Sequence, residues 1–343
     1  MPDSVERALV IGDGSWGTAL AILLCKNGID TTMWSAFPEH TEELQEHHEN
    51  KRFLPGIPLP ENLSFSADPY SAADGADLVC SVVPTQFLRS VAERFEDAIS
   101  GRTAIVTATK GLEIETFKTP SQILNEVLGE RPICVLTGPS HAEEVALGKP
   151  ATVVAACHDR DIALSVQKAF TSENFRVYTQ HDPVGAELAG ALKNVIALAA
   201  GISDGLELGD NAKAALLSRG MLEMARFGAA RGADPQTFFG LAGFGDLVTT
   251  CCSQHSRNRA VGEALGQGKT LRQILDEMEM VAEGVWTTKA LFGPESEPEE
   301  IDMPIAEQVH AVLFQDKDAR EAVLDLMRRE PVDEMDDTLK RNR

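Results

Sequence analysis

The segment that decides the fold of the first half of the chain is Arg7-Ala8-Leu9-Val10-Ile11-Gly12-Asp13-Gly14-Ser15-Trp16-Gly17. Its first five residues predict a strand, whose apolar run suits burial on both faces, and residues 17–27 predict a helix. In the Gly-x-Gly-x-x-Gly pattern, the first glycine permits a tight turn, the second lets the backbone approach a pyrophosphate, and the third allows close strand–helix packing. Because a helix N-terminus favours a diphosphate, the segment predicts a dinucleotide-binding loop.

Short strands and helical patterns alternate through residues 1–181. This alternation predicts a doubly wound, Rossmann-like α/β domain that binds a dinucleotide on a parallel sheet covered on both faces. The further predicted strands are residues 31–34, 77–83, 104–107, 133–136, 151–154 and 175–179. Such surroundings favour the dinucleotide loop over the alternative interpretation, a glycine turn without a ligand.

Residues 182–343 have a different character, rich in alanine, leucine, glutamate and glycine and without convincing strand patterns. We expect an all-α domain that holds the substrate and the catalytic groups. Its predicted helices are residues 184–202, 211–231, 257–265, 271–278, 305–314 and 319–329, with a loop at 293–298. The first of them is apolar on most faces, which indicates a helix at the centre of the domain.

The composition limits the partners of the protein. The chain has 343 residues, 43% of them hydrophobic and 24% charged, which suits two globular domains. A formal net charge of -22 argues against nucleic acid as a partner. We find no apolar run close to the roughly 18 uncharged residues that a membrane span needs and no signal-peptide pattern, so we expect a cytoplasmic protein. The sequence does not fix the oligomeric state, and a homodimer is compatible with it.

The chain offers little for a metal site. The vicinal pair Cys251-Cys252 lies near His255, but no second pair of ligands follows at the spacing of a zinc site. The other four cysteines lie singly in apolar patterns, where a buried free thiol is the usual interpretation. We therefore expect no metal.

The end of the second predicted strand bears on the cofactor. An acidic residue there binds the ribose of NAD, whereas this chain has Trp34-Ser35-Ala36-Phe37. Without a carboxylate at this position, a 2′-phosphate is tolerated, but no arginine is present to attract it. The cofactor is accordingly expected to be NADP or NAD, with NADPH accepted at least as well as NADH.

Three polar stretches stand out beyond the glycine loop. Lys110 follows a predicted strand, at the sheet edge where ligands bind in such folds. Lys193 lies in the most apolar predicted helix, where a lysine is costly unless it is paired or neutral, although it could also extend to the helix edge. Asp246 follows a glycine, where it could serve as a turn residue. Ser256 is the expected N-cap of a helix whose start, with Arg257, suits a phosphate.

The chain resembles the bacterial-type NAD(P)-dependent glycerol-3-phosphate dehydrogenases over nearly its whole length. The resemblance rests on many ordered blocks rather than on one motif. The matching stretches are Gly12-Asp13-Gly14-Ser15-Trp16-Gly17-Thr18-Ala19-Leu20, Phe53-Leu54-Pro55-Gly56-Ile57, Val83-Pro84-Thr85-Gln86, Lys110-Gly111-Leu112-Glu113, Gly138-Pro139-Ser140-His141-Ala142-Glu143-Glu144-Val145, Leu192-Lys193-Asn194, Gly209-Asp210-Asn211, Gly243-Phe244-Gly245-Asp246-Leu247 and Ser256-Arg257-Asn258.

The resemblance implies interconversion of glycerol 3-phosphate and dihydroxyacetone phosphate, which supplies glycerol 3-phosphate for phospholipid synthesis. It makes Lys193 the proton-transfer group, Lys110 the main source of the field that tunes it, and Asp246 the group that orients it. The implied substrate-binding residues are Lys110, Gly138, Ser140, Lys193, Asp246, Ser256, Arg257 and Asn258. The implied cofactor-binding residues are Gly12, Gly14, Ser15, Trp16, Gly17, Lys110, Ala142, Arg257, Val281 and Glu283.

Two positions depart from the family pattern. Asp13 stands where the family usually has alanine, and a carboxylate near the diphosphate is expected to weaken cofactor binding. Ala36 stands near a position where many members carry arginine or histidine.

Two other functions compete with the dehydrogenase: a related hydroxyacid dehydrogenase, and a silent dinucleotide-binding sensor or scaffold. Lys110 and the block at Ser256 favour a phosphorylated substrate and therefore argue against another hydroxyacid dehydrogenase. A buried base argues against a silent sensor or scaffold, which would have no use for it.

Overall fold

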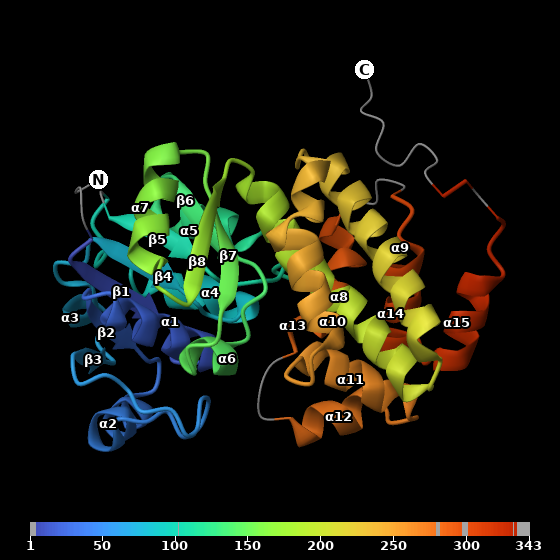
Figure 1. Cartoon of the computed structure of the whole chain (residues 1–343), viewed down its shortest axis with the longest axis horizontal. Helices are drawn as coiled ribbons and strands as arrows, with labels where there is room; N and C mark the ends of the chain where they lie inside the picture. The colour runs from blue at the N-terminus through green and yellow to red at the C-terminus, as the bar shows by residue number, and fades with distance from the viewer. Residues whose placement is uncertain (1–4, 102, 279–281, 297–300, 332, 335–343) are drawn as a thin grey trace. The chain divides into compact units, whose positions relative to one another are not determined.

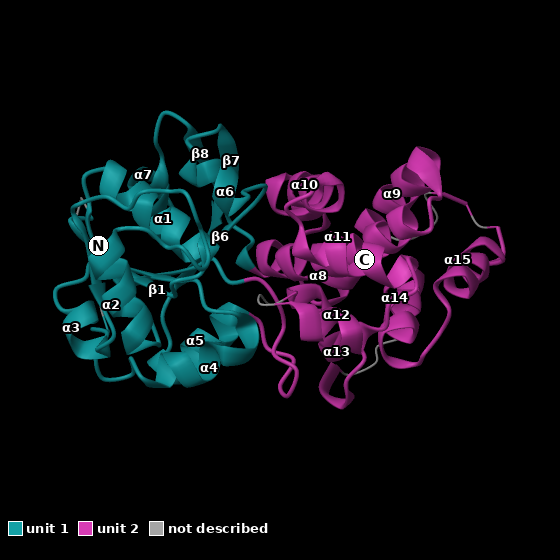
Figure 2. Ribbon diagram, turned by 90° about the horizontal axis from the view of Figure 1, so that it is seen from below, with its two compact units in different colours: residues 1–109, 120–183 teal, residues 110–119, 184–343 magenta. Residues whose placement is uncertain are grey.

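The computed structural model describes residues 5–101, 103–278, 282–296, 301–331 and 333–334. The chain divides into two compact units: unit 1 has residues 1–109 and 120–183, and unit 2 has residues 110–119 and 184–343 (Figure 2). Residues 110–119 therefore group with unit 2, whereas the sequence pattern places everything before residue 182 in the first domain. The segment matters because it carries Lys110.

Unit 1 contains one eight-stranded sheet in the order β3-β2-β1-β4-β5-β6-β7-β8. Its strands are β1 Arg7–Ile11, β2 Asp30–Trp34, β3 Leu63–Ser66, β4 Leu78–Ser81, β5 Ala104–Thr107, β6 Ile133–Thr137, β7 Ala151–Ala156 and β8 Phe175–Gln180 (Figure 1). Strand β1 is parallel to β2 and β4, so that Ile11 lies between Trp34 and Ser81. The three strands thus end together at the edge where the glycine loop begins.

The sheet differs from the predicted one in two respects. Strand β7 is antiparallel to β6, because the connection between them passes through a helix of only 5 residues rather than a full crossover. Strand β3 was missed, since Leu63–Ser66 is a short edge strand with polar residues at every second position. The doubly wound α/β class is nevertheless confirmed.

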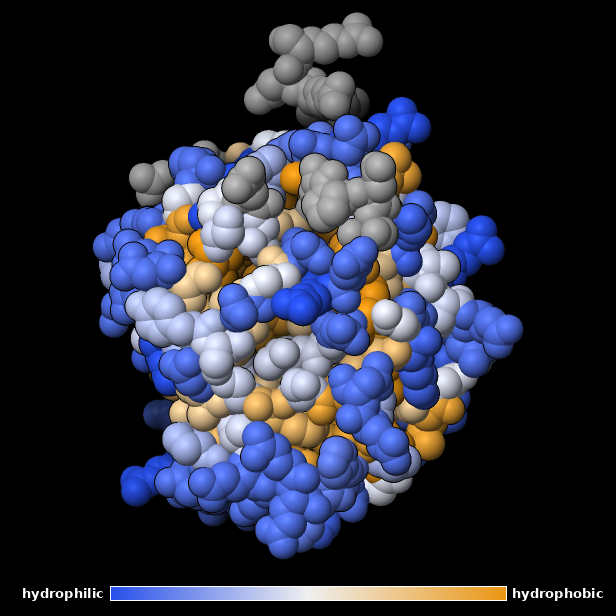
Figure 3. All heavy atoms as spheres, turned by 90° about the vertical axis from the view of Figure 1, so that its left-hand side faces the viewer, coloured by the Kyte–Doolittle hydropathy of each residue, from blue (hydrophilic) through white to orange (hydrophobic). Residues whose placement is uncertain are grey.

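Helices cover both faces of the sheet. They are α1 Ser15–Lys26, α2 Pro38–His47, α3 Pro69–Ala73, α4 Thr85–Glu93, α5 Pro120–Leu128, α6 Ala142–Ala146 and α7 Arg160–Phe170. Along β1, Ala8 and Val10 join the core under α1 and α7, whereas Leu9 and Ile11 join the core under α4 and α5. This alternation is the reason that β1 is apolar throughout. On the face of the molecule shown in Figure 3, hydrophilic side chains surround smaller apolar areas.

Unit 2 contains helices and, among its described residues, no strand. Its α-helices are α8 Pro183–Gly205, α9 Gly209–Ala230, α10 Asp246–Cys252, α11 Arg257–Gly266, α12 Leu271–Glu277, α13 Glu283–Leu291, α14 Pro304–Phe314 and α15 Ala319–Met327. Short turns of 3-10 helix span Pro235–Phe239 and Pro294–Ser296, and a π-helical turn spans Leu241–Gly245. The sequence pattern missed α10 and α13. The predicted loop at 293–298 contains the second 3-10 turn, and its last two residues lie outside the described part of the chain.

Helix α8 is the one helix of the described residues that is long and apolar enough to cross a membrane, with a mean hydropathy of 1.3. The expectation that no uncharged apolar run reaches this length is not contradicted, because Glu187, Lys193 and Asp204 interrupt the apolar residues of α8. Moreover, 94% of the apolar stretch of α8 that meets this criterion is buried inside the protein. The apolar composition follows from the place of α8 at the centre of unit 2, where helices surround it.

Helix α8 crosses α11 at backbone contact distance. A Cβ atom added to Gly201 of α8 would lie 2.0 Å from the carbonyl oxygen of Arg259, and one added to Gly262 would lie 2.0 Å from that of Leu198. Only glycine permits such an approach, because any side chain would enter the neighbouring backbone. The crossing brings the first turn of α11 beside α8.

Unit 2 also holds a buried carboxylate that the sequence analysis did not single out. Glu223 of α9 accepts hydrogen bonds from the backbone N–H groups of Ile305 (2.8 Å) and Ala306 (3.3 Å) and thereby caps α14. Burial raises the pKa of Glu223 to about 8, although these two bonds act in the opposite direction. The folded state therefore binds this proton more tightly than the unfolded chain does.

We expect Glu223→Gln to flatten the dependence of stability on pH. With a folded pKa raised above the unfolded value, the contribution of Glu223 is full at acid pH and is lost as pH rises towards 8. Between pH 6 and 7.5, the free energy of unfolding of the wild type should therefore fall by about 2 kcal/mol relative to that of the variant. Urea unfolding at both pH values measures this. The exposed carboxylate of Glu307, also near the start of α14, supplies the control Glu307→Gln; an equal gain in both variants would contradict the assignment.

Candidate active site

The site is built around Lys193, which lies in the middle of α8 and is 5% exposed. Its Nζ donates a hydrogen bond of 2.6 Å to Oδ1 of Asp246 and one of 2.8 Å to Oγ1 of Thr250. Both acceptors belong to α10, so the side chain that α8 contributes is fixed at its ammonium group by α10. The alternative in which Lys193 extends to the helix edge is therefore ruled out.

Asp246 connects Lys193 to Lys110. Its second oxygen, Oδ2, accepts a hydrogen bond of 2.7 Å from Nζ of Lys110. The carboxylate is 2% exposed and begins α10, directly after the π-helical turn. Thr250, one turn later, donates a hydrogen bond of 2.7 Å to the carbonyl oxygen of Asp246. The two lysines and one aspartate lie together in unit 2 and carry a net charge of +1 when all three are ionised.

The electrostatics of the cluster favour a lysine that can lose its proton. Burial lowers the pKa of Lys193 to about 8; Asp246 acts against this shift, and Lys110 acts with it. Burial is the largest of these causes, because Lys193 lies inside the helical core. For Asp246, burial by itself would raise the pKa, but Lys110 and Lys193 together lower it below its ordinary value. The aspartate is thus held ionised between two lysines.

The block around Ser256 has a divided role. Ser256 accepts a hydrogen bond from the backbone N–H of Arg259, which confirms it as the N-cap of α11. The amide of Asn258 is occupied, because it donates to Oδ1 of Asn194 (3.0 Å) and accepts from the backbone N–H of Gly284 (2.9 Å). Asn258 therefore ties α8, α11 and α13 together, and what it can offer a ligand is its backbone N–H in the first turn. Arg257 is exposed at the first helical position.

The glycine loop lies in unit 1, and its residues fit a dinucleotide. Gly12 has a φ of 117°, and Gly17 has no space for a side chain, because an added Cβ would lie 2.1 Å from the carbonyl oxygen of Gly12. A Cβ on Gly14 would meet nothing within 4 Å, so that the N-terminus of α1 is open to an approaching diphosphate. Ser15 and Trp16 open that helix.

The remaining predicted site residues lie in both units. In unit 1, Gly138 and Ser140 lie in the turn between β6 and α6, where Gly138 has a φ of 140°, and Ala142 begins α6. Glu283 begins α13 in unit 2, and Val281 lies outside the described residues. Within unit 2 the structure brings Lys110, Lys193 and Asp246 together. The roles of the other residues stay predictions.

Thr250 and Asn194 are residues of the site that the sequence analysis missed. Thr250 lies four positions after Asp246, and this spacing places two side chains on one face of a helix. The signal was present in the sequence, but α10 was not predicted after the glycines at 243 and 245. Asn194 is adjacent to Lys193, and its polar side chain in an apolar helix was itself a sign of a specific partner.

A dinucleotide loop in an α/β unit and a buried lysine held by aspartate in a helical unit are the parts of a nicotinamide-dependent dehydrogenase. Residues 7–163 match the family described as NAD-dependent glycerol-3-phosphate dehydrogenase N-terminus, and residues 182–324 match the family described as its C-terminus. The chain belongs to the NAD-dependent glycerol-3-phosphate dehydrogenase family.

Individual relatives agree with this assignment. Proteins named glycerol-3-phosphate dehydrogenase, NAD(P)+, from Chlorobium phaeobacteroides and Geobacter metallireducens are 47% and 51% identical to this chain. The alignments cover 96% and 95% of this chain and 99% and 98% of the relatives. The crystal structure of glycerol-3-phosphate dehydrogenase from Coxiella burnetii is similar with a TM-score of 0.91 and 37% identity, covering 95% of this chain and 99% of that one.

Proposed function

We propose that this protein interconverts sn-glycerol 3-phosphate and dihydroxyacetone phosphate, with NAD or NADP as the hydride acceptor or donor. The observation that carries the proposal is the buried pair of Lys193 and Asp246, joined by Lys110, in a chain of this family. A protein that only bound a dinucleotide would have no use for such a group. The silent sensor or scaffold is therefore the weaker alternative.

Lys193 acts as the acid–base group of the proposed reaction. In the oxidative direction its neutral amine takes the proton of the C2 hydroxyl while C2 loses a hydride; in the reductive direction its ammonium returns that proton to the developing alkoxide. The bound nicotinamide supplies the hydride chemistry. Asp246 and Thr250 hold Nζ of Lys193 in place, and Lys110 fixes the other oxygen of Asp246.

The start of α11 is the proposed phosphate site. Arg257 offers a guanidinium group with several donors, and the first-turn backbone N–H groups of α11 favour an anion. A phosphate bound there would distinguish this substrate from the unphosphorylated substrates of related hydroxyacid dehydrogenases. Gly138, Ser140 and Ser256 complete the substrate-binding set that we propose. Lys110, Ala142, Arg257, Val281 and Glu283 join the glycine loop in the proposed cofactor set.

Initial rates with dihydroxyacetone phosphate and either NADH or NADPH test the proposal. We expect oxidation of at least one of the two nucleotides that depends on dihydroxyacetone phosphate. A matched panel of unphosphorylated 2-keto acids and hydroxyketones is the control. Turnover of a compound from that panel without turnover of dihydroxyacetone phosphate would favour the related hydroxyacid dehydrogenase instead.

The pKa of Lys193 predicts opposite pH profiles for the two directions. Oxidation requires the neutral amine, so kcat/KM for glycerol 3-phosphate should rise about tenfold per pH unit below pH 8 and level off above it. Reduction requires the ammonium, so its kcat/KM should fall above pH 8. Steady-state rates from pH 6 to 10 measure both. A profile in which both directions rise together would show that the titrating group is not the acid–base group.

The biological setting is part of the same proposal. The activity would supply glycerol 3-phosphate for phospholipid synthesis in the cytoplasm, as the family resemblance implies. A homodimer would show twice the mass of the 37.1 kDa chain in light scattering. The mass of the chain itself would contradict the dimer and leave the activity untouched.

A further inference from the structure

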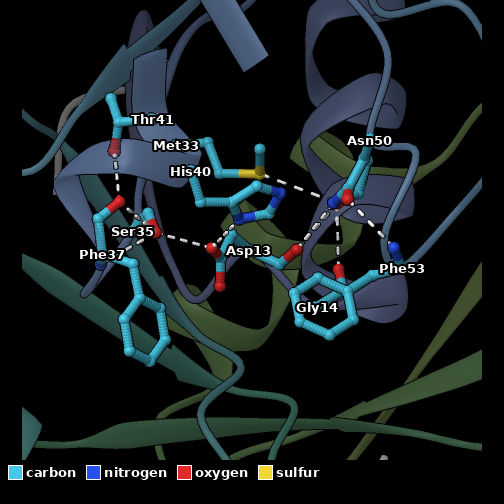
Figure 4. A network of polar contacts seen from close by, with 10 residues as sticks. Asp13, Gly14, Met33, Ser35, Phe37, His40, Thr41, Asn50 and Phe53 are labelled. Atoms are coloured by element: carbon cyan, nitrogen blue, oxygen red, sulfur yellow. Dashed lines mark hydrogen bonds and ion pairs between the residues drawn. The ribbon is translucent and has the colours of Figure 1, made fainter. Parts of the chain in front are cut away.

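The carboxylate of Asp13 lies at the end of β2, although Asp13 belongs to the glycine loop. Its Oδ2 accepts a hydrogen bond of 2.6 Å from Oγ of Ser35 and one of 2.7 Å from Nδ1 of His40 (Figure 4). Ser35 directly follows β2, and His40 lies in the first turn of α2. All three residues belong to unit 1.

The backbone around Asp13 is held as firmly as its side chain. The N–H of Gly12 donates to the carbonyl oxygen of Trp34 (3.1 Å), which ties the loop to the last residue of β2. Nδ2 of Asn50 donates to the carbonyl oxygen of Asp13 (2.7 Å) and to Oγ1 of Thr18 (2.8 Å). The position of the carboxylate is therefore set by the fold and not by solvent.

One oxygen of Asp13 is available to a ligand. Within the described part of the chain, both hydrogen bonds to the side chain end on Oδ2, and none ends on Oδ1. The side chain is 13% exposed, and its ion-pair partner among these residues is His40. An ionised carboxylate accepts hydrogen bonds on both oxygens, so Oδ1 keeps its full accepting capacity.

The position of this carboxylate has a known consequence in dinucleotide folds. A carboxylate at the end of the second strand accepts a hydrogen bond from the 2′-hydroxyl of the adenosine ribose and repels a 2′-phosphate. The sequence shows no such residue after β2, which led to the expectation that NADPH is well accepted. In the structure, the loop supplies the carboxylate that the strand lacks.

We infer that Asp13 selects the unphosphorylated adenosine ribose, so that the protein binds NADH more tightly than NADPH. The inference rests on the proposed function, because it concerns the cofactor of that reaction. It also gives Asp13 a different role from the expected weakening of diphosphate binding, since the side chain turns towards Ser35 and His40. His40 and Ser35 are positioning residues that hold Oδ2 and leave Oδ1 to the ribose.

Fluorescence titration of the protein with NADH and with NADPH tests the inference without any substrate. We expect the wild type to bind NADH at least about tenfold more tightly, the size of one charge-assisted hydrogen bond. Asp13→Asn keeps the shape and removes the charge, so it should weaken NADH binding and strengthen NADPH binding. The ratio of the two Kd values should then move by about tenfold or more towards NADPH. Asp74→Asn removes an equal charge from an exposed position of unit 1 and should leave the ratio unchanged.

The outcomes separate the inference from the function on which it rests. If both nucleotides bind the wild type with similar Kd values, or if Asp13→Asn weakens both in parallel, Asp13 is only a structural part of the loop and the inference is overturned. If the wild type binds neither nucleotide, the proposed function fails, and the inference fails with it. A circular dichroism spectrum shows whether each variant is folded.

Discussion

Replacement of Lys193 by methionine is expected to lower kcat by a factor of about 10²–10⁴ or more, the usual effect of removing a general acid–base group. Methionine keeps the length and apolar bulk of the side chain in α8, where Lys193 is 5% exposed, so the helical core should still form. The glycine loop belongs to the other unit and should bind NADH or NADPH within a few-fold of the wild type. Rate measurements and fluorescence titration together separate chemistry from binding.

Two further variants sharpen the test of Lys193. Lys193→Arg should restore little activity, because a guanidinium group does not lose its proton in the working pH range. Lys269→Met removes an exposed lysine of unit 2 that pairs with Glu277, and it should retain wild-type turnover. A methionine variant at position 193 that kept more than a tenth of kcat would assign proton transfer to another group.

Replacement of Arg257 by alanine is expected to raise KM for dihydroxyacetone phosphate by a factor of about 10–150. That range corresponds to the loss of one charge-assisted contact of about 1.5–3 kcal/mol. Arg257 is exposed at the first position of α11, so its removal should not disturb the core. The effect should fall mainly on KM, because the acid–base cluster at Lys193 keeps its partners.

An exposed arginine elsewhere in unit 2 provides the comparison. Arg272 lies near the start of α12, and Arg272→Ala should leave both kcat and KM close to wild type. An Arg257→Ala variant with unchanged kcat/KM would remove the phosphate role from this residue. The first-turn backbone N–H groups of α11 would then be left as the proposed anion site.

The strands that the sequence predicted well are those with apolar residues on both faces, such as Leu9-Val10-Ile11. A strand that is buried on both faces is apolar at nearly every position, and such a run can be recognised in the sequence. The direction of a strand cannot be recognised in this way, since β7 is apolar like the parallel strands β4 and β5 and yet runs antiparallel to β6. Helix α10 was missed because the glycines before Asp246 indicate a loop, whereas in the structure they form a π-helical turn that leads into the helix.

The candidate site was predictable as separate residues and not as an arrangement. The sequence identified each of Lys110, Lys193 and Asp246. The hydrogen bonds between them depend on how the segment 110–119, α8 and α10 pack together, which the sequence does not show. The position of Asp13 in the glycine loop suggested a side chain near the diphosphate. The structure shows that this side chain turns to Ser35 and His40, because a sequence gives the position of a side chain along the chain but not its direction.

The crossing of α8 and α11 has a consequence for how variants of this protein are interpreted. Gly201 and Gly262 take no part in the proposed chemistry, yet each lets one backbone rest directly on another. A methyl group at either position would act as a wedge that separates Arg257, at the start of α11, from Lys193, within α8. Loss of activity in such a variant would come from altered spacing between intact reactive groups, and it would resemble the loss of a catalytic residue in every assay that measures rate alone.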